Sequence, residues 1–565
     1  MKNQTRLFFI ILLFFSFGKK TNAQDCTLPQ AQKLLQGNNI SANILLGGDL
    51  FWDRNDASFN TYPSPLPDVH SIFNTGLWLG GFTGLPDNPI LKSAHSDYNS
   101  STSFDFSAGP LSSENGTVDF ETCANYDRLW EVLGSEIEQH ITDFNDNGII
   151  DNQISNIYSY PGHQNPYFEN NNGFTLPLNI QEFAPFWDND NDGIYNPDQG
   201  DYPLPSAVHK DHYPDHLIWG VFNDAGANHT SSSGDAIRAE IQVTAWASFC
   251  TDNVIINNTV FTSHKIINRA QDQIDSLFSG TFVDFDLGCY TDDYVGSIPS
   301  MNTFYAYNSS PSDGNNGICQ GGINTYADNP PVQAVTYLNQ NLNSFSTTTP
   351  PNTTTNFFTP AEIYNLLAGI WADGTPFTLG GTGYNSGGAE TSFLFDGNPN
   401  TANDWSMLTA NITDADFRTI SSIEIGSLNQ NESTTIDMAY TFYVDGSLDN
   451  IESVNMIYDN TPLLQQMYDD KFESTCTSIV LSNEDLTEYN IQVYPNPTSD
   501  ILNIKIENSL QANFSIFDMY GKRVLEKMEV NRNEIQLSTS NFSSGVYFLK
   551  IEMDGKEFVK KFIKI

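Results

Sequence analysis

The chain has 565 residues and carries 68 Asp and Glu against 24 Lys and Arg, a formal net charge of −44 at pH 7. At about 150 residues per domain, this length predicts several folding units. The charge is uneven, because residues 24–487 hold ten basic and 58 acidic side chains whereas residues 488–565 hold ten of each. Since phosphate recognition depends on clustered Lys and Arg, the acidic part argues against a nucleic acid partner and favours cations, although solubility alone also explains such acidity.

Residues 1–23 have the pattern of a secretory signal peptide. Lys2 and Arg6 precede an apolar run from Leu7 to Phe17, and small residues stand before Gln24. The apolar run is shorter than the ~20 residues that cross a bilayer, and no later stretch approaches that length. We therefore expect a mature chain without a transmembrane segment, either secreted or at the outer cell surface. The six cysteines that follow permit disulfides in such a compartment, and the sequence leaves their pairing open.

Residues 24–235 are predicted to form a loop-rich region that contains two acidic loops. Apolar residues at helical spacing between Tyr126 and Asp143 predict a helix that runs into the first loop. That loop has oxygen-bearing side chains at alternate positions around Gly148. Calcium prefers roughly six to eight oxygen ligands, and alternate side chains together with one backbone carbonyl can supply them. The candidate ligands of this loop are Asp143, Asn145, Asn147, the carbonyl of Ile149, and Asp151.

The second acidic loop, Asp188–Asn196, has the same spacing, with Gly193 at the sharp turn. It departs from an EF-hand because Gln199 stands where the bidentate Glu is required, so Asp198 or Asp201 would have to complete the site. Either acidic loop is also compatible with an Asn/Asp/Gly turn that satisfies its own backbone. We expect bound Ca²⁺, and the candidate ligands here are Asp188, Asp190, Asp192, the carbonyl of Ile194, and Asn196.

Residues 236–480 change to a period of two, which is typical of half-buried strands. Apolar and polar residues alternate at 240–249 and again at 435–444, and turn-forming residues separate further short runs. We therefore predict a mainly β protein whose body is an antiparallel β-sandwich or jelly roll with loop-rich insertions and a few helices. Helices are expected at 360–371 and 451–472. A solvated face is favoured over a shared cation for four acidic residues at one strand end: Asp284, Asp286, Asp292 and Asp293.

The body shows none of the short motifs that mark common catalytic sites. HExxH, a GxSxG elbow, a Walker loop and a GxGxxG after a strand are absent. His209, His212 and His216 are clustered, but Pro214 prevents a regular helix from aligning them as metal ligands. With 58 acids in the body, some carboxylate pair will always suit glycoside hydrolysis, so abundance makes that signal uninformative. No catalytic residue is predicted, and a hidden carboxylate pair stays open.

Residues 490–565, after a linker at 481–489, are predicted to form a small C-terminal β-sandwich. Val493-Tyr-Pro-Asn-Pro leads into an alternating strand, and Gly521-Lys-Arg, Ser544-Gly-Val-Tyr and a Lys-rich last strand follow. Together these elements resemble the type A C-terminal sorting domain of the Bacteroidota type IX secretion system. The resemblance implies that the type IX machinery is a partner of this module and that the chain passes the outer membrane, to be released or anchored at the cell surface.

The body resembles, more loosely, the large uncharacterised cargo proteins that carry this tail, in the blocks Phe183–Pro203 and Asp284–Gly296. That likeness implies no reaction. The sequence therefore favours a secreted or cell-surface, calcium-binding, non-enzymatic protein with an adhesin-like, structural or carbohydrate-binding role, whose partner is an extracellular glycan or protein. The alternative hypothesis is a secreted hydrolase that acts on polysaccharide.

Overall fold

The computed structural model describes residues 25–61, 69–85, 87–177, 183–315, 317–348, 355, 357–473, 491–496, 498–506, 512–518, 523–530, 534–543, 545–553 and 556–564. The expected signal peptide, residues 1–23, and the expected linker, residues 481–489, lie outside these ranges. The chain forms two compact units, Met1–Cys476 and Thr477–Ile565. Among the described residues, no helix combines the length and the apolar character that crossing a membrane requires.

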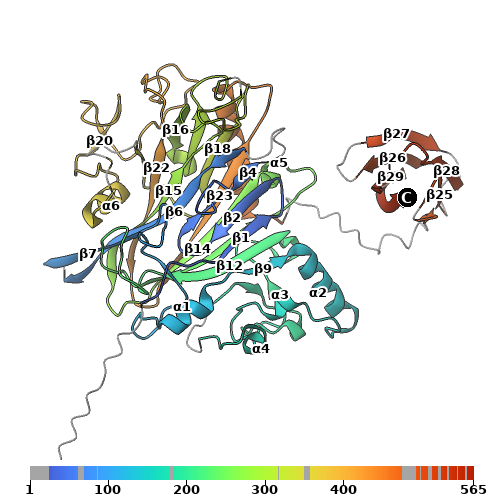
Figure 1. Ribbon diagram of the computed structural model, residues 1–565, viewed down its shortest axis with the longest axis horizontal. Helices are drawn as coiled ribbons and strands as arrows, with labels where there is room; N and C mark the ends of the chain where they lie inside the picture. Colours follow the sequence, from blue (N-terminus) through green and yellow to red (C-terminus); the bar gives the residue numbers. More distant parts are fainter. Residues whose placement is uncertain are drawn as a thin grey trace, which may run out of the picture. The chain divides into compact units, whose positions relative to one another are not determined.

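One large sheet of the first unit has ten strands (Figure 1). Its order is β19-β22-β15-β6-β3-β2-β4-β5, with β1 beside β2 and β7 beside β6, and neighbours run antiparallel. The strands are β1 (Gln32–Gln36), β2 (Ile40–Leu45), β3 (Asp49–Leu50), β4 (Phe59–Thr61), β5 (His70–Ile72), β6 (Asn74–Leu85), β7 (Asn88–His95), β15 (Ile274–Asp284), β19 (Ser344–Thr348) and β22 (Arg418–Leu428).

The second large sheet has nine strands, also antiparallel, in the order β16-β17-β18-β23-β14-β13-β12-β8, with β9 beside β12. Its strands are β8 (Ser107–Ala108), β9 (Trp130–Leu133), β12 (His216–Asn223), β13 (Ala239–Ala247), β14 (Thr259–Asn268), β16 (Asp293–Ile298), β17 (Thr303–Asn308), β18 (Val332–Tyr337) and β23 (Ser433–Tyr443).

The two large sheets share one apolar core. Ile44 and Leu79 of the first sheet belong to the same buried cluster as Ile241 and Tyr440 of the second. Phe51 packs edge-on against Tyr440, with ring centroids 4.8 Å apart. The body is therefore a mainly β, antiparallel sandwich, as the alternating sequence pattern predicts.

Residue 235 does not separate two folding units, although the sequence pattern places a boundary there. β12 and β13 flank this residue and pair along their length, from His216↔Ala247 to Asn223↔Glu240. In the other sheet, β6 pairs with β15. Because each sheet contains strands from residues 24–235 and from residues 236–480, joined at β12 with β13 and at β6 with β15, these two regions form one body.

A helical layer covers the outer face of the second sheet around β9 and β12 (Figure 1). Trp219 of β12 packs against Trp130 and Phe183, with ring centroids 5.7 and 4.8 Å apart. The helix predicted from residue 126 begins only at Gly134, because Trp130–Leu133 pairs with β12 as a strand. The layer contains α1 (Phe120–Tyr126), α2 (Gly134–Asn147), α3 (Ser155–Tyr158), α4 (Phe168–Asn172), β10 (Phe186–Trp187), the 3-10 helices Pro197–Gln199 and Lys210–His212, and β11 (Tyr202–Pro203).

The two later helical insertions lie close to where the sequence predicts them. α6 (Pro360–Leu367) begins with a capping box between Thr359 and Glu362 and packs on the first sheet through Leu366, beside Trp78 and Phe282. α7 (Asn455–Asp469) follows the 3-10 helix Glu452–Val454. The remaining elements of the body are α5 (Val254–Asn257), the 3-10 helix Pro299–Met301, β20 (Phe377–Thr378) and β21 (Glu390–Thr391).

The second unit is a small sandwich of two sheets around its own core. One sheet has the order β24-β25-β28 and the other β27-β26-β29-β30. Leu502 and Leu537 of the first sheet share a buried cluster with Ile516 and Leu549 of the second. The strands are β24 (Ile491–Tyr494), β25 (Ile501–Ile506), β26 (Ala512–Asp518), β27 (Arg523–Val530), β28 (Glu534–Ser538), β29 (Gly545–Met553) and β30 (Lys556–Lys564).

A buried histidine holds the segment 224–235 against β7. His229 places Nδ1 2.8 Å from the carbonyl oxygen of Ser93 and Nε2 2.6 Å from that of Asp224. Because carbonyls only accept hydrogen bonds, both ring nitrogens must carry protons, so this geometry requires an imidazolium. Burial alone lowers the pKa of His229, but the Asp224 and Asp105 carboxylates outweigh it and raise the pKa above its ordinary value of 6.5.

The protonation of His229 predicts a pH dependence of stability. A pKa raised in the folded state gives stability that is complete below the unfolded pKa and is lost as pH rises through the folded pKa. We expect His229→Gln to lower the free energy of unfolding by about 1–3 kcal/mol at pH 5.5 and by less at pH 9. Urea unfolding of both proteins across this range checks the difference. His163→Gln is the control, because that ring lies in an exposed contact with its neighbour Gln164. A difference that stays constant with pH would mean a neutral ring.

Candidate metal centre

The loop Asp188–Asp201 is held closed at its two ends by a short pair of strands. Trp187 of β10 pairs with Tyr202 of β11. Between them, Asn191 and Gly193 have positive φ values of 59° and 79°. Glycine adopts this left-handed region freely and Asn tolerates it, which explains why these residue types permit so tight a turn.

Three carboxylates converge in this loop. Oxygens of Asp188, Asp190 and Asp201 lie within 4.8 Å of one another, and Asp201 is buried whereas Asp190 is exposed. Two oxygens on opposite sides of one Ca²⁺ are about 4.8 Å apart, since Ca–O distances are about 2.4 Å. The three residues can therefore reach a single ion of this size.

Asp201 supplies the buried side of the centre. Its carboxylate accepts hydrogen bonds from the backbone N–H groups of Asn189 and Asn196, each at 2.8 Å. Burial raises the pKa of Asp201 to about 6 despite these two bonds, and the negative charges of Asp188 and Asp190 contribute to the rise. A divalent cation in contact with the three carboxylates would reverse that repulsion.

All the predicted side chains of this loop accept backbone hydrogen bonds. Asp188 accepts the N–H of Gly193 at 2.8 Å, and Asp190 accepts that of Asp192 at 3.3 Å. Asp192 accepts the N–H of Ile194 at 2.7 Å, and Asn196 accepts the N–H of Asp198 at 3.2 Å. These are Asx-type turns, the alternative that the sequence leaves open. The predicted ligand atom of Ile194 is its carbonyl oxygen, and its role stays a prediction.

Asp198 and Asp201 were equal candidates to complete the site, and the structure separates them. Asp198 accepts hydrogen bonds from the hydroxyl groups of Tyr158 and Tyr167. Asp201 instead faces Asp188 and Asp190. Asp201 is therefore the better candidate for the last ligand.

The first acidic loop has a different geometry, because α2 continues through Asn147. Successive helical residues are about 100° apart, so Asp143 and Asn147 share one face while Asn145 points away. Asp143 accepts the N–H of Asn152 at 2.8 Å, and Asn147 accepts that of Ile149 at 2.8 Å and donates to Asp151 at 3.3 Å. Joint coordination by this set would require the last turn of α2 to unwind.

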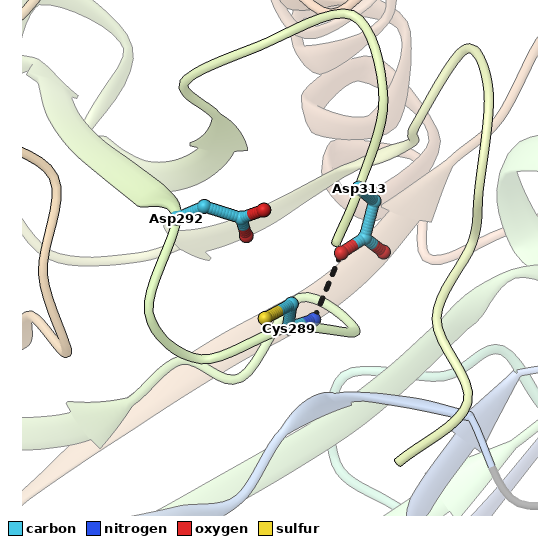
Figure 2. Close-up of side chains that lie close together, drawn as sticks. All are labelled: Cys289, Asp292 and Asp313. Carbon is cyan, nitrogen blue, oxygen red and sulfur yellow. Dashed lines mark hydrogen bonds between the residues drawn. The ribbon is translucent and has the colours of Figure 1, made fainter. Parts of the chain in front are cut away.

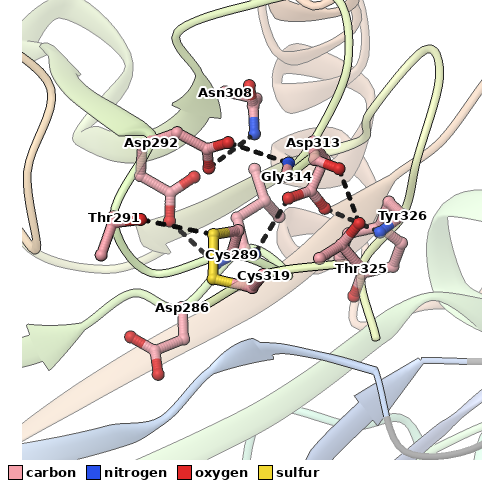
Figure 3. Close-up of a disulfide and its surroundings, with 12 residues drawn as sticks. Asp286, Cys289, Thr291, Asp292, Asn308, Asp313, Gly314, Cys319, Thr325 and Tyr326 are labelled. Atoms are coloured by element: carbon pink, nitrogen blue, oxygen red, sulfur yellow. Dashed lines mark hydrogen bonds between the residues drawn. A yellow bond between two sulfur atoms is a disulfide. The ribbon is translucent and has the colours of Figure 1, made fainter. Parts of the chain in front are cut away.

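Three of the four acidic residues at the end of β15, namely Asp284, Asp286 and Asp293, are buried, which corrects the expected solvated face. Asp284 is 3% exposed and Asp293 0%. The segment 309–329 folds over this strand end and is joined to it by the Cys289–Cys319 disulfide (Figure 3). A second disulfide, Cys26–Cys123, lies elsewhere in the body.

Cys289, Asp292 and Asp313 form a further group of potential metal ligands (Figure 2). The sulfur of Cys289 is bonded to Cys319, so it is no thiolate ligand. Asp313 accepts the N–H groups of Cys289 at 2.9 Å and Tyr326 at 2.7 Å. Asp292 accepts the N–H of Gly314 at 2.9 Å and the amide of Asn308 at 3.2 Å (Figure 3).

These contacts make Asp292 and Asp313 a clamp between two loops. Burial, with a contribution from Asp292, raises the pKa of Asp313 to about 7. The close fit also explains Gly288, because a Cβ there would lie 2.0 Å from a carboxylate oxygen of Asp313. The group stabilises the fold through backbone donors and needs no ion.

The histidines at 209–216 belong to two different elements. His209 and His212 lie at the 3-10 helix Lys210–His212, with ring centroids 6.1 Å apart, whereas His216 lies in β12. His209 caps the 3-10 helix by accepting the N–H of Asp211. His216 is 5% exposed and accepts the N–H of Gln36 at 3.1 Å. Their roles are local and structural.

Comparison with known proteins identifies the second unit. Residues 492–565 match the secretion system C-terminal sorting domain. No curated protein sequence matches the chain. Among solved structures, a polysaccharide lyase aligns with 65% of this chain at 7% identity and a TM-score of 0.17. The chain covers 37% of the length of that lyase, and a likeness this distant carries no argument about the body. The sorting domain, together with the β24–β30 sandwich that forms it, identifies the chain as exported cargo of the type IX secretion system.

Proposed function

We propose that this cargo protein is a calcium-stabilised, non-enzymatic binding or structural protein that acts outside the cell. The convergence of Asp188, Asp190 and Asp201 carries the calcium part of the proposal. Two unit charges 4 Å apart repel by about 1 kcal/mol in water and about 4 kcal/mol near a protein surface. Three such charges oppose closure of the loop, and a divalent cation would remove that opposition.

The ion would stabilise more than the loop itself. Tyr195, within the loop, is fully buried and donates its hydroxyl to the carbonyl of Ile157 at 2.8 Å. Gly200 packs on the ring of Phe144 in α2. The loop is therefore part of the helical layer that covers the second sheet, and a cation there would stabilise the folded layer.

Calcium is expected to raise the melting temperature of the body. An ion that binds only the folded state stabilises it by about 2.7 kcal/mol when its free concentration is a hundred times the dissociation constant. Extracellular calcium modules bind at roughly 0.1 to 1 mM, so millimolar calcium suffices for a measurable rise. Asp188→Asn combined with Asp190→Asn should abolish most of the rise that scanning calorimetry records.

Asp252→Asn combined with Asp272→Asn is the matched control, because both residues are exposed and stand outside every carboxylate group described above. This control removes the same charge and should keep the full response to calcium. An equal melting temperature in calcium and in chelator, without binding heat, would refute the calcium centre.

One arrangement in the body has the residue types of a serine hydrolase. Ser231 Oγ lies 3.2 Å from His95 Nε2, and His95 Nδ1 lies 3.8 Å from Asp105 Oδ2. The second distance is too long for a hydrogen bond, so Asp105 does not orient the ring as a general base requires. Asp105 instead accepts the backbone N–H groups of His95, Ser231 and Ser232, and these bonds join two segments.

We expect the chain to bind extracellular glycans or proteins without converting them. An array of polysaccharides and matrix proteins, followed by chromatography of the incubated ligands, measures both properties. Retention of a ligand with no new product supports the proposal. Shortened polysaccharide chains would favour the alternative, a secreted hydrolase.

Export is expected to depend on the sorting domain, with residues 1–23 acting earlier as a signal peptide. A chain that ends at Asn483 keeps the sandwich body but loses the whole sorting domain. It should remain inside the outer membrane, whereas the full chain reaches the surface or the medium. Immunoblots of cell fractions and medium compare the two. Equal delivery of the truncated chain to the medium would contradict this role.

A further inference from the structure

A second group of carboxylates lies at one end of the ten-stranded sheet. Asp284 ends β15, Asp286 follows it, and Asp416 stands just before β22. The pairing of Asp284 with Arg418 across β15 and β22 brings these segments together. Oxygens of the three aspartates lie within 4.8 Å of one another.

Nearby positive charge compensates this group only in part. Arg418 donates from Nη2 to Asp416 Oδ2 at 2.9 Å, and its Nε lies 3.5 Å from Asp284 Oδ1, beyond a hydrogen bond. His70 Nε2 is 3.7 Å from Asp286 Oδ2. Three carboxylates therefore face one guanidinium and one imidazole.

Two of the aspartates each have one carboxylate oxygen that accepts a hydrogen bond and one that accepts none. Asp284 accepts the hydroxyl of Tyr98, and Asp416 Oδ2 accepts from Arg418. Asp284 Oδ1 and Asp416 Oδ1 are both buried without a hydrogen-bond donor. A buried carboxylate oxygen without a hydrogen bond is costly, and Arg418 is shared between Asp284 and Asp416, so a further positive charge would stabilise the group.

The neighbouring clamp gives the contrast. Asp292 and Asp313 also lie close together, but both oxygens of each accept a hydrogen bond. Their charge is dispersed over backbone and amide donors. The second oxygens of Asp284 and Asp416 accept no hydrogen bond. The two groups lie near the same strand end, but hydrogen bonds disperse the negative charge only in the group of Asp292 and Asp313.

We propose that Asp284, Asp286 and Asp416 bind one divalent cation of the calcium type. All three offer oxygen, which hard cations prefer. Opposite oxygens lie about 4.8 Å apart around Ca²⁺, so three oxygens within 4.8 Å of one another can reach one such ion. Tyr98 and Arg418 fix the orientation of two ligands, and water would complete the coordination on the partly exposed side of Asp416.

The cation would join the segment after β15 to the segment before β22, at the end of the sheet where His70 also lies. This site shares no residue with the loop Asp188–Asp201 and does not rest on calcium binding there. The two centres can therefore be tested separately.

Calorimetric titration of the metal-free full chain with CaCl₂ alone tests the proposal. In a background that carries Asp188→Asn and Asp190→Asn, we expect one ion to remain bound per chain. Adding Asp416→Asn should remove it. Asp414→Asn is the matched control, because Asp414 is exposed, lies two residues away and stands outside the group, and it should leave the ion bound.

The proposal would be overturned if the chain with Asp188→Asn and Asp190→Asn, the loop-disabled background, bound no calcium. It would also be overturned if the ion stayed bound after Asp416→Asn was added. If Asp416→Asn fails to fold by circular dichroism, Tb³⁺ luminescence in the loop-disabled background decides. Tyr98 touches Asp284 and should sensitise Tb³⁺ at this site. Tyr98→Phe should then remove at least half of the luminescence, and an unchanged signal would place the ion elsewhere. If calcium no longer raises the melting temperature of the variant with Asp188→Asn and Asp190→Asn, that result concerns only the proposed function. It does not affect the proposed site at Asp284, Asp286 and Asp416.

Discussion

Burial of both faces of the central strands is the constraint on which the rest of the body depends. All nine residues of β13 are buried, although its sequence alternates between apolar and polar side chains. The polar face must therefore find partners inside the protein. Glu240 does so through two bonds to Arg269, at 3.0 and 3.1 Å, and one from the N–H of Leu111. Buried polar pairs of this kind attach the surrounding segments to the second sheet, and the His229 contacts attach another segment to β7.

Period-two alternation predicts strands such as β13 and β23 correctly, because successive side chains of any strand point to opposite faces. It does not show whether the polar face meets water. The covering layer comes from residues that are distant in the sequence, so no local pattern reports it. The same limit explains the helix that was predicted too early. The apolar spacing of Leu129, Val132 and Leu133 also suits a strand, and the edge of β12 decides in favour of pairing.

The candidate metal centre was predictable only as far as its ligands are close in sequence. The spacing of Asp188 and Asp190 around a glycine indicates the loop, but Asp201 lies beyond the motif and is selected by burial. Asp192 and Asn196 fit the spacing equally well but lie outside the group of converging carboxylates, although all four side chains accept a nearby backbone N–H. Asp416 could not have been found, since it is far from Asp284 in the chain and only the pairing of β15 with β22 brings them together.

A body with ten basic and 58 acidic residues stabilises several buried carboxylates by means other than Lys and Arg. Backbone donors are one solution, and Asp313 uses them; these hydrogen bonds need no cation. A cation is another solution, and its contribution grows with the free ion concentration because binding favours only the folded state. The stability of the clamp at Asp313 therefore does not depend on the free cation concentration. The stability of the loop at Asp188 and of the sheet end at Asp284 would instead follow the ionic composition outside the cell, where the sorting domain delivers the protein.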